Sequence, residues 1–429
     1  MRYKPLNKSI YISNRLNFIN QMNGNAIAIF NSNDIYPVSA DSELPFEQHR
    51  DIFYLTGIDQ EETVLILYPF SKNKSTREIL FIRKSDNHTK IWEGEKLSKK
   101  LARELSGIEN IHYVEDLKKI LKQLIFSADS FYLNKNEHYR ANSPVETRED
   151  RFNNWLLKKY PHYNIKRSNP ILQRLRSIKH LDEIDQIKKA CDITNKGFQR
   201  VLKFIKPNVW EYQIEAEFIH EFINNSSKGF AYLPIIASGS DNNILHYTKN
   251  NKQCKDGDLI LMDVGSEYGN YSSDMTRTVP VSGRYSRRQK EVYYSVLKVK
   301  NEATKLLKVG NNWKTFNEQV GELMTKELMD LKLIDKNDIK LQSKKNPAYK
   351  KYFMHGTSHH LGLDTHDYGL LEDPFKKNMV FTVEPGIYIP EEGFGIRLED
   401  DIVIQKDGEP LNLMEEIPID PDHIEELMN

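Results

Sequence analysis

The sequence predicts two domains, an α/β domain followed by an α+β domain. A chain of 429 residues exceeds the size at which a single hydrophobic core usually stops growing. In its first third, short apolar runs alternate with segments of helical spacing, which is typical of an α/β domain. The order then changes to two helices followed by strands, and this order occurs twice. We therefore expect an N-terminal domain at 1–172 and a second domain at 173–429.

Strands of the first domain are expected where aliphatic and β-branched residues cluster, at 26–32, 63–69 and 78–84. Apolar residues at steps of three and four predict helices at 96–106 and 114–126. Residues 158–177 lose this periodicity and contain two prolines. We place the boundary in that stretch, near residue 172.

The second domain begins with a long amphipathic helix that Pro207 terminates. A second helix follows from about Glu211, and the pair recurs with helices near Arg287 and Lys314. Strands are then expected within 378–389 and 394–405. The apolar face of the first helix is traced by Ile184, Ile187, Cys191, Thr194, Phe198, Val201 and Ile205.

Composition indicates a globular protein without a strong global charge. The 61 basic residues equal the 61 acidic ones, so no overall field draws the chain to nucleic acid or to a membrane. The N-terminus lacks the apolar core of a signal peptide, and the longest aliphatic run, 63–70, is shorter than the roughly 18 residues of a membrane span. Two cysteines form no disulfide framework or zinc knuckle. A cytoplasmic location is expected.

Two aspartates stand within otherwise apolar strands at 257–281. Asp263 follows Leu259 and Leu261, which we expect to be buried, and an aspartate there is costly unless it is paired or binds a metal. Asp274 lies early in the returning strand. Both carboxylates can therefore point into one space.

Two glutamates repeat this pattern near the C-terminus. Glu384 interrupts an apolar strand, Pro385 favours extended geometry before it, and Gly386 permits a sharp exit. Further along, alternation within one strand sorts the side chains into two faces. One face holds Arg397, Glu399 and Asp401, and the other holds Ile396, Leu398, Ile402 and Ile404.

Four carboxylates together with one histidine have the composition of a metal site. The histidines of FMHGTSHHLGLDTHD (353–367) supply the candidates. Two divalent cations would neutralise four carboxylates, whereas one would leave about two buried negative charges, each costing several kcal/mol. Oxygen-rich ligands with one imidazole suit manganese first, with cobalt, zinc or iron as alternatives. A single acidic residue in a strand is more often a surface residue or half of an ion pair, so the indication comes from the whole set.

Several segments together resemble aminopeptidase P, the Xaa-Pro aminopeptidase branch of the pita-bread (creatinase/methionine aminopeptidase-like) metallopeptidases. They are LHYTKN, MDVGSEYGNYSSDMTRTVPV, FMHGTSHHLGLDTHD, TVEPGIYI and GIRLEDDIVI. The resemblance covers most of 175–410, and 41–59 is similar to the family's N-terminal domain. It implies a pita-bread domain whose pseudo-twofold repeats surround a curved antiparallel sheet.

The resemblance also implies a role for each candidate residue. The metal ligands would be Asp263, Asp274, His359, Glu384 and Glu399. Glu384, His246 and His366 would act in catalysis, and His355, Tyr388 and Arg397 would line the substrate pocket. His360 matches no family role, and we interpret it as a packing residue.

The implied reaction is hydrolysis of the bond between an N-terminal residue and a penultimate proline, with two divalent metal ions sharing a bridging hydroxide. Substrates would be peptides with proline at the second position, and relatives often form homodimers or homotetramers. Prolidase, which cuts only Xaa-Pro dipeptides on the same fold, is the nearest alternative. Methionine aminopeptidase and a non-catalytic pita-bread binding protein are further alternatives.

Overall fold

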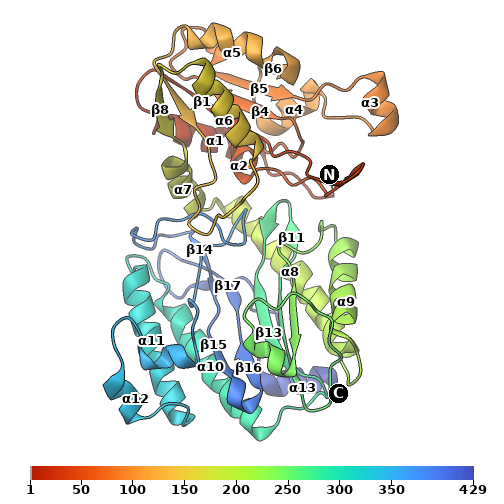
Figure 1. Cartoon of the computed structure of the whole chain (residues 1–429), viewed down its shortest axis with the longest axis vertical. Helices are drawn as coiled ribbons and strands as arrows, with labels where there is room; N and C mark the ends of the chain where they lie inside the picture. Colours follow the sequence, from red (N-terminus) through yellow and green to blue (C-terminus); the bar gives the residue numbers. More distant parts are fainter. Residues whose placement is uncertain (1) are drawn as a thin grey trace. The chain divides into compact units, whose positions relative to one another are not determined.

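The computed structural model describes residues 2–429 of the chain. It divides into two compact units, one made of Pro5–Arg176 and the other of Ser177–Asn429 with the residues up to Lys4 (Figure 1). Cys191 and Cys254 are both buried and free. Within residues 2–429, no helix has the length and apolar character needed to cross a bilayer.

The Pro5–Arg176 unit contains a six-stranded sheet of order β6-β5-β4-β1-β7-β8. β4 runs antiparallel to its neighbours β1 and β5, while the remaining pairs are parallel. The strands expected from the sequence at 26–32, 63–69 and 78–84 are confirmed as β1, β4 and β5. The bounds are β1 (Ala26–Asn31), β4 (Val64–Leu67), β5 (Glu78–Ile82), β6 (Ile111–Tyr113), β7 (Ser130–Leu133) and β8 (Asn164–Arg167), with a separate hairpin of β2 (Pro37–Ser39) and β3 (Ser42–Glu43).

Helices α5 and α6 cover one face of this sheet (Figure 1). Leu121 of α5 and Leu156 of α6 are buried in one cluster with Ile27 and Ile29 of β1, because alternate residues of a strand face the same side. On the other face, Phe30 of β1 contacts Phe18 of α1. The helices are α1 (Lys8–Ile19), α2 (Arg50–Thr56), α3 (Asn87–Trp92), α4 (Lys99–Ser106), α5 (Leu117–Ile125), α6 (Arg148–Lys159) and α7 (Asn169–Ser177).

The second unit has the expected repetition of helix pairs. The long amphipathic helix is α8, and the apolar face predicted for it is buried. Gly197 allows α8 and α9 to pack closely, since a Cβ there would lie 2.8 Å from the ring of Phe218. The helices are α8 (Leu181–Phe204), α9 (Glu211–Asn224), α10 (Arg287–Leu306), α11 (Trp313–Asp330), α12 (Lys336–Leu341) and α13 (Pro421–Met428).

Each helix pair is followed by antiparallel strands, which agrees with the expected pita-bread architecture. The first half forms the sheet β13-β10-β9 and the hairpin β11-β12, and the second half forms β14-β17-β18 and β15-β16. The strands are β9 (Ile235–Ser238), β10 (Leu259–Val264), β11 (Glu267–Tyr268), β12 (Tyr271–Ser272), β13 (Met275–Pro280), β14 (Val380–Val383), β15 (Gly386–Ile389), β16 (Phe394–Arg397), β17 (Asp400–Val403) and β18 (Leu411–Asn412).

The strand expected to run continuously through 394–405 is divided into β16 and β17. The partner strand contains Pro385, which has no N–H to donate to the ladder. At the break, the Leu398 N–H donates to the carbonyl oxygen of Pro385, and the Glu399 N–H donates to that of Thr276 in β13. The interruption therefore links the strands of the second half to those of the first.

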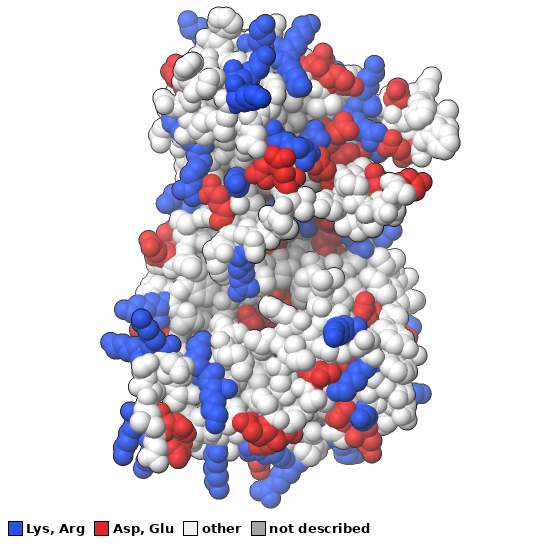
Figure 2. All heavy atoms as spheres, in the orientation of Figure 1, with Lys and Arg blue, Asp and Glu red and all other residues white. Residues whose placement is uncertain are grey.

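Charged side chains are intermingled on the surface. In the view of Figure 2, Lys and Arg are interspersed with Asp and Glu over most of each unit. This agrees with the equal numbers of basic and acidic residues in the chain.

Candidate metal centre

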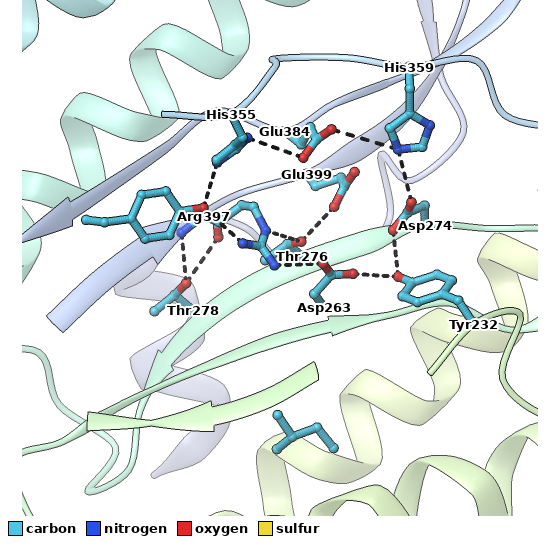
Figure 3. Close-up of polar contacts among 12 residues, drawn as sticks. Tyr232, Asp263, Asp274, Thr276, Thr278, His355, His359, Glu384, Arg397 and Glu399 are labelled. Atoms are coloured by element: carbon cyan, nitrogen blue, oxygen red, sulfur yellow. Dashed lines mark hydrogen bonds and ion pairs between the residues drawn. The ribbon is translucent and has the colours of Figure 1, made fainter. Parts of the chain in front are cut away.

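The two aspartates approach each other at one end of the β10–β13 ladder. Asp263 is in β10 and Asp274 directly precedes β13, so the antiparallel register brings both carboxylates to the same end. Gly265 is required there, because a Cβ would lie 1.8 Å from the carbonyl oxygen of Ser273. The hydroxyl of Tyr232 lies 2.6 Å from an oxygen of each carboxylate (Figure 3).

The two glutamates occupy the break between the ladders of the second half. The β14–β17 and β15–β16 ladders leave two residues unpaired on each strand, Glu384–Pro385 on one and Leu398–Glu399 on the other. Glu399 is 2% exposed and accepts a hydrogen bond of 2.6 Å from the Thr276 hydroxyl. Because both glutamates lie outside the regular ladders, their side chains need not alternate between the two faces of a strand. Both point toward the aspartates (Figure 3).

His359 enters this group from a segment that runs beside β14. The Thr382 N–H donates to the carbonyl oxygen of His359 at 3.0 Å. The His359 Nε2 atom lies 3.4 Å from Asp274 Oδ2 and 3.8 Å from Glu384 Oε1. Its Nδ1 lies 3.0 Å from the carbonyl oxygen of His360. Because that carbonyl can only accept, Nδ1 carries a hydrogen, and Nε2, which faces the carboxylates, is the nitrogen that can coordinate a metal.

His360 points to the opposite side and joins the core, as the packing interpretation expected. Its ring is 4.5 Å from that of Phe381 and 5.8 Å from that of Trp313, between ring centroids. The side chain is 5% exposed. Adjacent residues of an extended segment face opposite sides, so one histidine of the pair reaches the carboxylates and the other packs in the interior.

Burial and mutual repulsion perturb the carboxylates. Burial, with the charge of Asp263, raises the pKa of Asp274 well above its usual range, and burial with the charges of Asp274 and Glu384 does the same to the pKa of Glu399. Burial raises the pKa of Glu384 to about 7. A phenol has one hydrogen, so the Tyr232 hydroxyl can donate to only one of these two aspartates at a time. A divalent cation would offset the mutual repulsion of these carboxylates and favour their ionised forms.

A chain of hydrogen bonds joins the cluster to the predicted pocket residues. Arg397 Nη2 donates to Asp263 Oδ2 at 2.7 Å, and Arg397 Nη1 donates to the Tyr388 hydroxyl at 2.9 Å. The His355 Nε2 atom is 2.7 Å from that hydroxyl. Burial, with the charge of Arg397, lowers the pKa of His355 to about 3. The imidazole of His355 is therefore neutral at physiological pH.

The two remaining predicted histidines are exposed. The His366 ring lies 4.3 Å from that of His359, between centroids. His246 precedes Tyr247, whose ring is buried. The imidazole of His246 lies close enough to His355 for a positive charge on it to lower the pKa of His355. All ten site residues predicted from the sequence belong to the same unit.

The donor set fits a divalent cation. Asp274, His359 and Glu399 offer ligand atoms that all lie within 4.8 Å of one another. Asp263 and Glu384 lie beside these three residues. Asp263 shares the Tyr232 hydroxyl with Asp274, and Glu384 lies next to His359. Four carboxylates and one neutral imidazole are typical ligands for manganese and related divalent metals.

Two residues that orient the carboxylates, Tyr232 and Thr276, were not predicted from the sequence. Tyr232 lies in an irregular segment between α9 and β9, where no periodicity draws attention to it. Thr276 lies in the strand after Asp274, and only the pairing of that strand with Glu399 reveals its role.

Comparison with known proteins places these features in a family. A model of metallopeptidase family M24 matches residues 185–406, and a model of the aminopeptidase P N-terminal domain matches residues 11–132. The Xaa-Pro aminopeptidase of Escherichia coli (strain K12) is 34% identical over 423 residues, which span 94% of each chain.

Two solved structures show the same similarity in three dimensions. Proline aminopeptidase P II from Yersinia pestis is 32% identical with a TM-score of 0.89, and the match covers 99% of both chains. Zinc-substituted E. coli aminopeptidase P in complex with product is 31% identical with a TM-score of 0.89, also over 99% of both chains. The chain described here belongs to metallopeptidase family M24 and carries the aminopeptidase P N-terminal domain before its metallopeptidase domain.

Proposed function

We propose that the chain is a metal-dependent Xaa-Pro aminopeptidase, which hydrolyses the bond between an N-terminal residue and a penultimate proline. The observation that carries this proposal is the buried cluster of Asp274, His359 and Glu399, flanked by Asp263 and Glu384. It occurs in a chain that matches a Xaa-Pro aminopeptidase over nearly its whole length.

Five residues would hold two divalent cations, with manganese expected first and cobalt, zinc or iron as alternatives. These residues are Asp263, Asp274, His359, Glu384 and Glu399. Bound cations would supply Lewis-acid polarisation of the scissile carbonyl and lower the pKa of a bound water. Tyr232 and Thr276 would keep the carboxylates oriented, since their hydroxyls lie 2.6 Å from oxygens of Asp263, Asp274 and Glu399.

Glu384 is the best-placed proton acceptor of the cluster. One of its oxygens lies 3.8 Å from His359 Nε2 and the other 3.6 Å from His355 Nδ1. Its carboxylate thus lies between a metal ligand and a predicted pocket residue. From this position it would take a proton from the attacking water and deliver it to the proline nitrogen of the leaving group.

The substrate pocket would use His355, Tyr388 and Arg397. Proline has no amide N–H, so the pocket must select the ring by shape. The hydrogen bonds from Arg397 to Tyr388 and between Tyr388 and His355 fix these side chains before substrate arrives. His246 and His366 are exposed and would donate to the developing oxyanion and to the following backbone.

We propose that residues 1–172 form the N-terminal domain and that residues 173–429 carry catalysis. A cytoplasmic location and a homodimer or homotetramer stay predictions. Peptides with proline at the second position are the expected partners.

Product analysis tests this proposal against prolidase. The manganese-loaded protein is incubated with Gly-Pro-Ala and, separately, with Gly-Pro. Release of glycine and Pro-Ala from the tripeptide is expected. Cleavage of the dipeptide alone would establish prolidase, and no cleavage of either peptide by a metal-loaded protein would favour a non-catalytic binding protein.

A further inference from the structure

A pocket of about 620 Å³ lies wholly within the Pro5–Arg176 unit, whereas every predicted metal ligand belongs to the other unit. Its volume is in the range of about 300–1,000 Å³ found for small-molecule sites. The lining comes from the end of β1, the turn after β6, the first turn of α5 and the first two turns of α6. The proposed peptidase activity assigns no role to these residues.

The pocket occupies a position that the topology of the sheet favours. From β1 the chain proceeds outward through β4 and β5 to β6 at one edge, and then returns to β7 on the opposite side of β1. In open α/β sheets, ligands bind outside the carboxyl ends of the strands where the strand order reverses in this way. Asn31, the last residue of β1, lines the pocket at this point.

Part of the lining of the pocket is aromatic and apolar. Phe152 and Trp155 of α6 lie side by side, with ring centroids 5.5 Å apart. Both are only partly buried, and both pack against the core cluster under α5 and α6 together with Val114. The rings are therefore held in place by the core while part of each faces the pocket, which suits a flat apolar group.

Three other residues of the lining are cationic. Lys118, Arg148 and Arg151 line the pocket, against one carboxylate, that of Glu115. Asp34 pairs with both arginines and holds them in place. The Lys118 ammonium lies 5.5 Å from the centroid of the Trp155 ring, and no carboxylate within residues 2–429 pairs with it at ion-pair distance. Its charge is therefore available to an anion bound against the ring.

Asn31 is fixed from behind by a buried carboxyl group. Glu149, which is 3% exposed, receives a hydrogen bond from the Asn31 backbone N–H at 2.9 Å and from its side-chain amide at 2.8 Å. The Asn31 side chain is thus held in one conformation before any ligand arrives. Such pre-organisation reduces the entropy lost on binding.

We propose that this pocket is a binding site for a small aromatic carboxylate. The aromatic body would stack on Trp155 and Phe152, and the carboxylate would pair with Lys118 and Arg151. Because the pocket and the predicted metal ligands belong to different units, binding in the pocket can be measured without peptidase activity.

Calorimetric titration of the full-length chain with three probes tests the proposal. Indole-3-propionate carries both the ring and the carboxylate, tryptamine carries the ring with a positive charge, and propionate carries the carboxylate alone. Saturable binding of one indole-3-propionate per chain is expected, with much weaker binding of the other two. Equal binding of tryptamine or of propionate, or no binding of indole-3-propionate, would overturn the proposal.

Two pairs of variants locate the binding. Lys118→Glu changes an exposed side chain and should weaken indole-3-propionate binding about tenfold or more, because it replaces a charge-assisted contact with repulsion. Lys122→Glu, one turn further along α5 and outside the lining, should leave it unchanged. Trp155→Ala should abolish binding, with Trp210→Ala in the other unit as its control. Unchanged affinity in Lys118→Glu would place the ligand elsewhere, even if Trp155→Ala failed to fold.

Discussion

Replacing His359 and His360 one at a time by alanine should separate metal binding from folding. The residues are adjacent, yet His359 Nε2 lies 3.4 Å from Asp274 Oδ2 whereas the His360 ring packs against Phe381 and Trp313. His359→Ala removes the only imidazole of the proposed ligand set. Since loss of a residue that merely supports a ligand typically weakens metal binding by about 10–100-fold, loss of the ligand itself should weaken it by at least that much.

His360→Ala should instead destabilise the fold and leave metal binding unchanged. Removing a ring that is 5% exposed leaves a cavity beside two aromatic residues, and truncations of this kind cost about 2–4 kcal/mol of folding free energy. The metal-free variant should therefore melt several degrees below wild type. Its metal content and its activity per folded molecule should stay close to wild type.

The assay combines equilibrium dialysis against manganese, elemental analysis of bound metal and a thermal melt of each chelated variant. The expected pattern is loss of metal in His359→Ala and loss of stability in His360→Ala. If His360→Ala lost the metal while His359→Ala kept it, His360 and not His359 would be the metal ligand. If both lost the metal to the same extent, the two residues would not have separate roles.

Glu384→Gln should fold but lose activity by about 10²–10⁴-fold, since it removes the proposed proton acceptor; glycine release within a few-fold of wild type would exclude that role. Burial, opposed by hydrogen bonds from Asn31, raises the pKa of Glu149 from 4.5 to about 8. Between these two pKa values the folded state keeps a proton that the unfolded chain releases. The free energy of unfolding should therefore fall by about 4 kcal/mol as the pH rises from about 4.5 to 8. In denaturant unfolding, the loss of stability over this pH range should be smaller in Glu149→Gln than in wild type by about this amount, because the other buried carboxyl groups with raised pKa values contribute equally to both. Chelated protein should melt a few degrees higher with manganese at 100 times its dissociation constant, where each independent ion contributes about 2.7 kcal/mol; no shift with manganese, cobalt, zinc or iron would contradict a metal centre.

The helices and the ligand-bearing strands could be predicted because local patterns specify them. The apolar face of α8 follows a helical period, and Asp263 stands out as a charged residue among buried aliphatic ones. Glu384 and Glu399 stand out for the same reason. Such signals need only a short window of sequence.

The geometry that joins these residues could not be predicted in this way. Tyr232 contacts Asp263 and Asp274 across 31 and 42 positions of sequence, and no periodicity marks it. The division of the expected strand into β16 and β17 depends on its partner, where Pro385 lacks an N–H. The pocket in the Pro5–Arg176 unit arises where β1, α5 and α6 meet, and none of these segments indicates it alone.

We propose that the carboxylate and histidine cluster binds the metal ions on which the Xaa-Pro aminopeptidase activity of this chain depends. The most direct test is glycine release from Gly-Pro-Ala by chelated protein as manganese is added back, with Gly-Ala-Ala as the control peptide. No glycine should be released after chelation, release should rise with bound manganese, and the control peptide should stay intact. Cleavage of Gly-Pro-Ala that persists after complete removal of metal, or equal cleavage of both peptides, would contradict the claim.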